Sequence, residues 1–317
     1  MTAVIAEVPG PTHVGPGTGR PRRRTRITRE SLMKASFIVP AALYVVLFFG
    51  YPVVKNVMMS LQAYTSKTFF TGQAPWVGLE NYVTVFTSQL FGPAMLNTML
   101  FTVGSIAGQF VIGLALALFF ARRFALSGLL RSLLLLPWLL PLIVSSATWR
   151  SILDNDSGVL NGLLVSLGLG AVPWLTSTQF ALIAVIMVNV WIGIPFNVTI
   201  LYGGIKEIPA ELYEAGALDG AVGWKAFRHI TWPNLRPVVS VVLVLGVVYT
   251  VKVLDIILGL TNGGPANATQ TIAVRSYQES FVNFDFGVGA AFSNILIVIS
   301  LLFAIIYLRA NRRAVDE

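Results

Sequence analysis

The ionisable side chains that could take part in chemistry are concentrated in one stretch of this chain, residues 207–237. Acids come first and bases follow: Glu207, Glu211, Glu214 and Asp219, then Lys225, Arg228 and Arg236. Because of their spacing, Glu207, Glu211 and Glu214 would share one face of a helix. Such a helix is too polar to stay in lipid and too regular for a plain linker.

Turn and end signals divide this stretch into two short helices. Pro209 suits a helix N-terminus, where the acids also favour the helix dipole. Gly220 and Gly223 would end the first helix, and a second would cover residues 225–229 until Pro233 stops it. The sequence therefore predicts a helix, a turn and a second helix.

Catalytic chemistry has no other support in the sequence. The chain has no Cys, which excludes disulfides, thiolate metal sites and Cys nucleophiles. Its two histidines, His13 and His229, stand apart in polar segments, so we expect no His-based metal cluster. The G-x-x-x-x-G-K-S/T phosphate loop is also missing. We therefore expect no enzyme, no metal site and no cofactor bound by this chain itself.

Composition and apolar runs indicate an all-α, multi-pass membrane protein. The chain is 55% hydrophobic and 11% charged, against about 25% charged residues in soluble domains. Six apolar segments are each near the ~20 residues that cross a bilayer as a helix. They are residues 36–58, 94–121, 130–152, 179–205, 237–260 and 287–309. Glycines and Pro173 interrupt Gly158–Leu175, so we expect a short external helix or re-entrant piece there.

Charge placement predicts which end faces the cytoplasm. Most Lys and Arg residues fall in the N-terminal segment, in residues 122–131, in the polar stretch and near the C-terminus. The exceptions are Lys55, Lys67, Arg150, Lys252 and Arg275. By the positive-inside rule, both termini and the polar stretch are cytoplasmic. We expect a disordered basic tail over 1–34, a membrane domain over 35–310 with a cytoplasmic loop at 206–237, and a tail over 311–317.

The polar stretch resembles the EAA loop of ABC-importer permeases. That pattern reads E-A-A-x3-G-x9-I-x-L-P, and the matching positions are Glu214, Ala215, Gly216, Gly220, Ile230 and Pro233. The chain departs from the pattern at Gly216, in place of the second Ala, and at Trp232, in place of the Leu. We expect Gly216 to keep a small residue where a partner surface approaches.

Three further stretches are similar to maltose-type members of that family. Trp76–Tyr82 resembles the G-L-x-N-Y stretch that follows the first core helix of sugar permeases. Leu260–Pro265 resembles a signature, L-T-x-G-G-P, of the maltose-type subfamily. Val188–Val198 resembles the N-x-W-x-G-x-P region in which such permeases contact sugar.

The resemblance implies the MetI-like fold and the partners of a bacterial type I ABC importer in the cell membrane. The loop would dock on a separate ATPase subunit, which binds ATP and Mg. The coupling residues would be Glu211, Glu214, Ala215, Gly216, Asp219, Gly220, Ile230 and Pro233. Two ATPase subunits, a second homologous permease and an extracytoplasmic solute-binding protein would complete the complex.

Candidate residues for a substrate path lie in the fourth and fifth apolar segments. They are Asn189, Trp191, Gly193, Phe196, Asn197, Gly246, Thr250, Lys252 and Asp255. Asn189, Gly193 and Phe196 form one helical stripe that offers an amide, room for close approach and a stacking face for a sugar. Helix packing is the alternative explanation of this stripe. Lys252 and Asp255 are three apart and should either pair or face a cavity, as a structural ion pair or in a substrate role.

The function that these features predict is ATP-driven import of a carbohydrate, a sugar or oligosaccharide, through a permease in the lipid bilayer. Glycerol phosphate or another small polar solute is an alternative cargo. A secondary transporter would carry ionisable residues in several spans, whereas only Lys252 and Asp255 qualify here. The net charge of +8 follows membrane topology, so no nucleic-acid partner is expected.

Overall fold

The described part of the chain is helical throughout its named elements. The computed structural model describes residues 29–122 and 124–315, and it contains helices joined by turns and two isolated β-bridges. The chain divides into two compact units, residues 1–52 and 53–317. The expected all-α class is therefore confirmed.

The described part of the first unit, residues 29–52, is a single run of helix. It holds α1 (Arg29–Val45) and the π-turn η1 (Val46–Gly50), and the chain then continues into α2 (Tyr51–Ser60). Helix α1 begins within residues 1–34, which we expected to be disordered. Residues 1–28 lie outside the described part of the chain.

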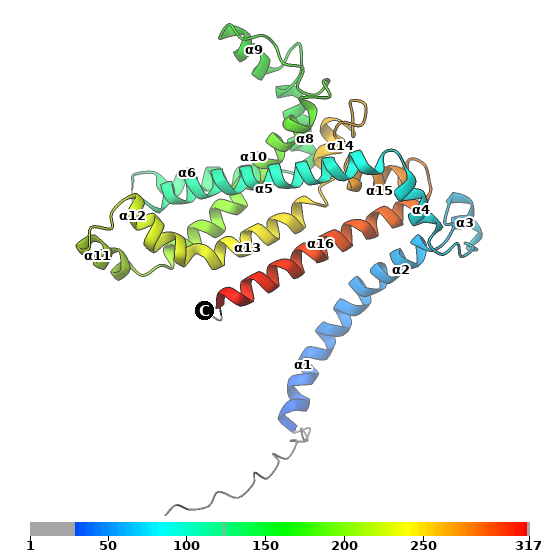
Figure 1. The fold of residues 1–317 in the computed structure, drawn as a ribbon, viewed down its shortest axis with the longest axis horizontal. Helices are drawn as coiled ribbons and strands as arrows, with labels where there is room; N and C mark the ends of the chain where they lie inside the picture. Colours follow the sequence, from blue (N-terminus) through cyan, green and yellow to red (C-terminus); the bar gives the residue numbers. More distant parts are fainter. Residues whose placement is uncertain (1–28, 123, 316–317) are drawn as a thin grey trace, which may run out of the picture. The chain divides into compact units, whose positions relative to one another are not determined.

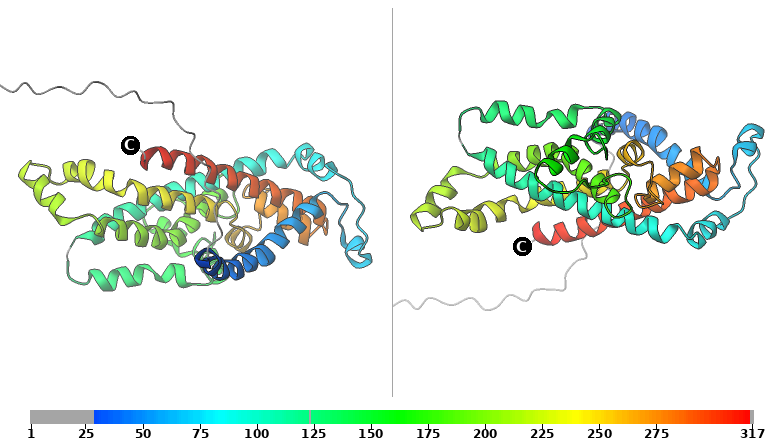
Figure 2. Two further views of the ribbon diagram at one scale, coloured as in Figure 1. Left: turned by 90° about the horizontal axis from the view of Figure 1, so that it is seen from below. Right: turned by 90° about the horizontal axis from the view of Figure 1, so that it is seen from above.

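The second unit contains the remaining helices. Their bounds are α3 (Ser66–Thr71), α4 (Glu80–Thr87), α5 (Phe91–Ala121), α6 (Ser127–Leu134), α7 (Leu136–Leu139), α8 (Leu142–Ile152), α9 (Val159–Ser166), α10 (Ala181–Lys206), α11 (Ala210–Leu218), α12 (Trp224–Ala226), the π-turn η2 (Phe227–Thr231), α13 (Trp232–Thr250), α14 (Asp255–Leu260), α15 (Ile272–Phe281) and α16 (Phe286–Val315). Helices α5, α10, α13 and α16 run lengthwise side by side and form the body of this unit (Figures 1 and 2).

Helices α5 and α10 are parallel and approach each other at glycines. A Cβ atom added to Gly108 would lie 2.7 Å from Val190 Cγ2, and one added to Gly113 would lie 2.6 Å from Asn197 Cβ. On the other helix, a Cβ at Gly193 would lie 2.3 Å from Gln109 Cδ. Small residues that let helix backbones approach closely are the usual packing device within membranes, where helices lack a hydrophobic driving force for association.

Among the described residues, five helices are long and apolar enough to cross a membrane, or six if one bent pair counts as a span. The bent pair joins Ser127–Leu139 to Leu142–Ile152 at an angle of 98°, so the predicted span 130–152 is present as a bent pair and not as a straight helix. The bend lies at Leu140, which has extended ψ of 138°. Pro141 follows it, and a residue before proline is pushed out of the helical region by the proline ring.

The fifth predicted span, 237–260, is also interrupted. Helix α13 ends at Thr250, residues 251–254 are not helical, and the short α14 follows. At the other end, the helix that crosses the membrane begins much earlier and runs over Trp224–Thr250. Pro237 lies inside this helix.

A buried polar cluster ties α2 to α4 and α16. Asn294 Nδ2 donates to Ser60 Oγ and to Tyr82 Oη, each at 3.0 Å, and Asn294 Oδ1 accepts from Asn56 Nδ2 at 2.7 Å. Asn81 Nδ2 donates to the carbonyl of Ser60 at 2.9 Å. The Asn and Tyr of the G-L-x-N-Y stretch therefore hold the end of α2 in place.

The segment Gly158–Leu175 forms an arm that projects from the bundle and contains only the short helix α9, as expected (Figure 1). Buried Asn161 closes the arm, because its side chain bonds to both the N–H and the carbonyl of Val172, each at 3.0 Å. At its base, Ser157 donates backbone and side-chain hydrogen bonds to Asp154, which hold the pKa of that exposed carboxyl below its usual value.

The glycine contact between α5 and α10 gives a direct test. Gly113→Ala places a methyl group against the Cβ of Asn197, which cannot move without its backbone. We expect a loss of about 1–3 kcal/mol of stability from overpacking, measured as a lower melting temperature in detergent. Gly203→Ala is the matched control on α10, since a Cβ there meets nothing within 4 Å. Equal melting temperatures for both variants would contradict this account of the packing.

Candidate functional site

The polar loop forms a compact pair of helices at one end of the second unit (Figure 1). Pro209 is the N-cap of α11, as its sequence position suggested. Glu207, however, is the C-cap of α10. The expectation that it shares a helical face with Glu211 and Glu214 is therefore wrong, because the chain leaves α10 and turns at Pro209 before α11 begins.

Glycine makes the turn between α11 and the next helix. Gly220 has φ of +75°, and Gly223 has φ of +57° with ψ of −121°. The N–H of Ala221 donates to the carbonyl of Gly216 at 2.7 Å, which closes the end of α11. Residues with a Cβ rarely adopt such positive φ values, so both glycines are required by the backbone.

Two contacts lock the halves of the loop together. A Cβ at Gly216 would lie 2.5 Å from Ile230 Cδ1, and Tyr213 Oη is 3.0 Å from Thr231 Oγ1. Gly216 therefore packs against Ile230 of its own chain on the side where a Cβ would stand, and a partner contact at this residue stays a prediction. The spacing of Gly216 and Ile230 in the EAA pattern brings these two residues into contact.

The second helix of the loop does not stop at Pro233. It continues through the π-turn η2 into α13, and the N–H of Trp232 bonds to the carbonyl of Phe227, five residues earlier. The wider turn changes the hydrogen-bond register just before Pro233, which has no N–H to donate. The proline is thereby accommodated at the start of α13.

The outer surface of the loop is open to a partner. Glu211, Glu214, Ala215, Asp219, Gly220 and Pro233 are exposed, whereas Gly216 and Ile230 are half-buried. The most exposed large apolar side chains of the loop are Leu218 at 91%, Trp224 at 71% and Val222 at 64%. Our sequence argument missed these three residues, although apolar residues within a charged stretch were a visible signal. We call Leu218, Val222 and Trp224 the apolar tip.

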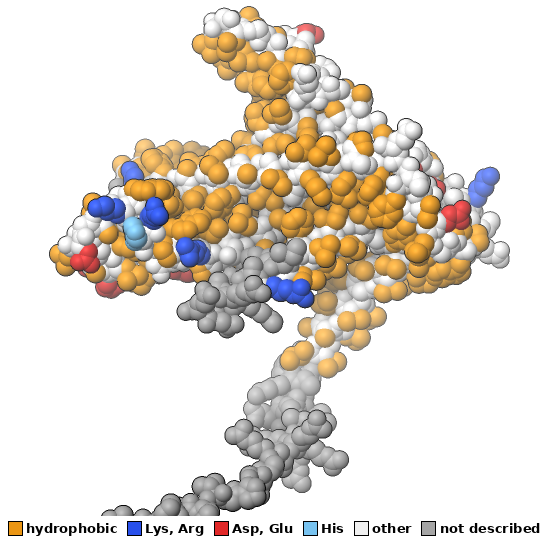
Figure 3. Space-filling view, viewed as in Figure 1, with side chains coloured by type: hydrophobic (Ala, Val, Ile, Leu, Met, Phe, Trp, Pro, Cys, Tyr) orange, Lys and Arg blue, Asp and Glu red, His pale blue; other side chains and the backbone are white. Residues whose placement is uncertain are grey.

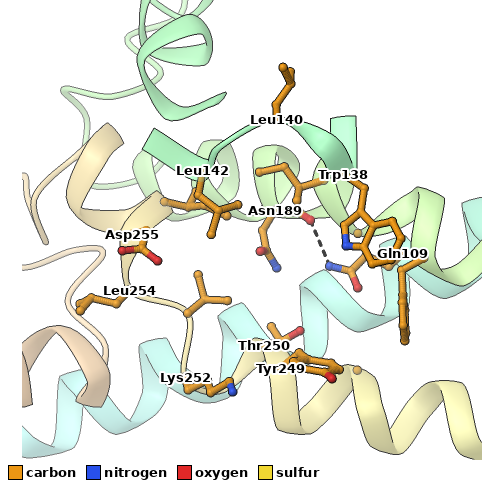
Figure 4. Close-up of a pocket in the computed structure, with 16 residues that line it drawn as sticks. Gln109, Trp138, Leu140, Leu142, Asn189, Tyr249, Thr250, Lys252, Leu254 and Asp255 are labelled. Atoms are coloured by element: carbon orange, nitrogen blue, oxygen red, sulfur yellow. Dashed lines mark hydrogen bonds between the residues drawn. The ribbon is translucent and has the colours of Figure 1, made fainter. Parts of the chain in front are cut away.

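A second candidate site is a cavity of about 550 Å³ between α5, α7, α10, α13 and α14 (Figure 4). Seven of the predicted path residues line it: Asn189, Gly193, Phe196, Gly246, Thr250, Lys252 and Asp255. The other two lie elsewhere. Trp191 packs edge-on against Trp149, with ring centroids 5.4 Å apart, and buried Asn197 donates to the carbonyl of Gly193 at 3.0 Å.

The side-chain amide of Asn189, in the cavity wall, has an unused hydrogen-bond donor. Gln109 Nε2 donates to the backbone carbonyl of Asn189 at 3.0 Å, and it fits there because Gly193 has no side chain. The Asn189 side chain points toward the middle of the cavity in Figure 4. Its Nδ2 is buried and has no hydrogen-bond partner in the described part of the chain, so it is a donor without an acceptor.

Aromatic rings line another part of the wall. Phe196 lies 6.3 Å from Trp138 and 6.1 Å from Tyr249, ring centroid to centroid, so three helices contribute to one aromatic arc. Gln109, Trp138 and Tyr249 were absent from our predicted set. A single Gln within the apolar run of α5 was a signal for Gln109, but only the fold brings the two rings to Phe196.

Lys252 and Asp255 line the cavity but do not pair. Both are exposed, and neither forms an ion pair with any described residue. Lys252 Nζ instead lies 5.3 Å from the centre of the Tyr249 ring, a cation–π contact. Of the two alternatives, pairing or facing a cavity, the structure shows the second. Pairing required a continuous helix, and the interruption at 251–254 removes that helical spacing.

Comparison with known proteins gives consistent matches. A family described as "binding-protein-dependent transport system inner membrane component" matches residues 109–316. The chain is 34% identical over 285 residues to the trehalose/maltose transport system permease protein MalF of Thermococcus litoralis, covering 90% of this chain and 95% of that protein. It is 32% identical to the diacetylchitobiose uptake system permease protein DasB of Streptomyces coelicolor, covering 95% and 94%.

The fold is also similar to a solved structure. A chain from the crystal structure of a bacterial ABC transporter involved in the import of the acidic polysaccharide alginate superposes with a TM-score of 0.77. The match covers 90% of this chain and 97% of that chain at 23% sequence identity.

The turn of the polar loop can be tested on its own. Gly223→Ala forces a side chain into a backbone region reserved for glycine, so we expect the loop to lose order at a cost of about 1–2 kcal/mol. Faster tryptic cleavage after Lys225 would report this change. Gly128→Ala is the control, because Gly128 lacks positive φ and has open space at its Cβ position. Unchanged cleavage in the Gly223 variant would contradict the role of this turn.

Proposed function

The chain belongs to the family of binding-protein-dependent transport system inner membrane components, and from this premise we propose that it is the permease of an ATP-driven carbohydrate importer. The observation that carries the proposal is the cavity between the long helices. Its volume of about 550 Å³ falls within the usual range of small-molecule sites. A relative named for trehalose and maltose and one named for diacetylchitobiose support the same class of solute.

The chemistry of the cavity wall suits a sugar. Asn189 offers a free amide donor, and Thr250 lies across the cavity with a hydroxyl group (Figure 4). Phe196, Trp138 and Tyr249 offer ring faces for the C–H faces of a pyranose. Glycerol phosphate or another small polar solute would use the amide and Lys252 but not the aromatic arc, which favours a carbohydrate.

We propose that ATP is hydrolysed on other subunits and that the resulting movement is transmitted to the cavity of this chain. This subunit is the membrane component and not the enzyme of its transport system, so ATP and Mg would be bound by two separate ATPase subunits. The EAA loop presents exposed Glu211, Glu214 and Asp219 beside the apolar tip. A central apolar anchor with a polar rim is the usual composition of a protein interface.

The complex around this chain follows from the family. Transport by this family depends on a binding protein, which would deliver the solute at the extracytoplasmic face. A second homologous permease would complete the translocation path, and both termini would be cytoplasmic by the positive-inside rule. A secondary transporter would have no use for an EAA loop.

Uptake by the assembled transporter tests the cavity. Asn189→Ala removes the free donor and Phe196→Ala removes a stacking face, so we expect each to raise the half-saturating solute concentration roughly 2–10-fold. Phe70→Ala is the matched control, since Phe70 is 86% exposed and lies outside the cavity. Wild-type uptake kinetics in both cavity variants would assign the stripe to helix packing.

Co-purification of the ATPase tests the loop. Glu214→Lys reverses a charge on α11, and Leu218→Glu puts a charge in the apolar tip, so we expect both to reduce ATPase retention at least tenfold. Leu167→Glu makes the same change at a residue 75% exposed, at the end of α9, and should retain the ATPase. The isolated chain should hydrolyse no ATP. Full retention by both loop variants would show that the loop is not the coupling element.

A further inference from the structure

A group of cations surrounds one tyrosine where α5 and α10 end beside the EAA loop. Arg131 Cζ of α6 lies 4.4 Å from the centre of the Tyr202 ring, and Lys206 Nζ lies 5.6 Å from it. Lys206 Nζ also donates to the carbonyl of Ala121 at the end of α5, at 3.3 Å. The next residue, Arg122, is exposed. We call Arg122, Arg131, Tyr202 and Lys206 the cation cluster.

No acidic side chain neutralises this cluster within the described part of the chain. The ion pair of the described residues joins Arg275 to Glu279 and lies on α15, not in the cluster. Glu207 forms no ion pair with its neighbour Lys206. Figure 3 shows Lys and Arg side chains gathered at the end that carries α11 and α12, beside a broad apolar flank. Several cations at one place, paired only with a ring and a carbonyl, form a site for an anion.

Exposed apolar side chains adjoin the cluster. Leu126, Leu129 and Leu133 on and before α6 are 67%, 56% and 50% exposed, and Phe119 of α5 is 48% exposed. Leu126 is held at φ of +66°, which a leucine rarely adopts. An acidic protein surface would satisfy the cations but leave these side chains uncovered, whereas a phospholipid supplies both an anionic headgroup and acyl chains.

We propose that the cation cluster binds the headgroup phosphate of an anionic phospholipid, whose acyl chains cover the leucines of α6. Arg131 and Lys206 hold the phosphate from two helices, with Tyr202 between them, and Arg122 adds charge at the rim. A lipid bound here would link α6 to the ends of α5 and α10. This site is separate from the cavity and from the apolar tip.

The retention of phospholipid by the purified protein tests the proposal. The full-length chain, purified with its accompanying subunits, is placed in nanodiscs of phosphatidylcholine with a minor fraction of phosphatidylglycerol, and bound lipid is measured by native mass spectrometry. We expect selective retention of phosphatidylglycerol by the wild type. Arg131→Gln and Lys206→Gln should each weaken this retention about fivefold, and Arg131→Lys should preserve it.

Controls distinguish lipid binding at a specific site from general electrostatic attraction between anionic lipid and the protein. Arg309→Gln removes an exposed cation of α16 outside the cluster, and it should retain phosphatidylglycerol like the wild type. Equal loss in Arg309→Gln and Arg131→Gln would overturn the proposal, as would unchanged retention in both cluster variants. Soluble glycerol phosphate should not displace the lipid, and displacement at equal concentration would identify a free phosphate site instead. Unchanged melting temperatures exclude unfolding as the cause of lipid loss.

Discussion

Helices α5 and α10 lie close together because each offers glycine where the other offers a side chain. Gly108 and Gly113 receive Val190 and Asn197, and Gly193 receives Gln109. This reciprocal fit fixes the two helices in parallel and in register. It also directs the Gln109 amide to the Asn189 backbone, which leaves the Asn189 side chain free to point into the cavity. The cavity wall therefore depends on a packing constraint between two helices.

Much of the architecture can be predicted from the sequence, because membrane insertion requires long apolar runs and a biased placement of charges. Long apolar runs identify the spans, and the charges around them predict an orientation. The helix–turn–helix of the EAA loop is equally visible, since Gly220 and Gly223 adopt the positive φ values that their positions suggest. The breaks within spans are harder to predict. The proline at 141 was a sufficient cause of the bend, but an apolar run on either side concealed it.

Side-chain contacts between distant segments could not be predicted at the same level. Lys252 and Asp255 suit an ion pair on a helix, and they remain apart because the helix stops between them. The contact of Gly216 with Ile230 of the same loop was also not foreseen. Trp138 and Tyr249 join Phe196 only after three helices assemble. These contacts have one feature in common. The sequence argument considered each residue only within its own helix and left out neighbours from other segments.

The helix over Trp224–Thr250 spans both functional regions of the chain. Its first residues belong to the EAA loop, and its last turns carry Gly246 and Tyr249 of the cavity wall. At 1.5 Å per residue it is a rod of roughly 40 Å. The helix is continuous from the loop to the cavity wall, with the π-turn η2 and Pro233 in its first half and Pro237 at its midpoint. Under the proposed function, a docked partner that tilts this rod by a few degrees about the loop would shift the cavity wall by an ångström or more.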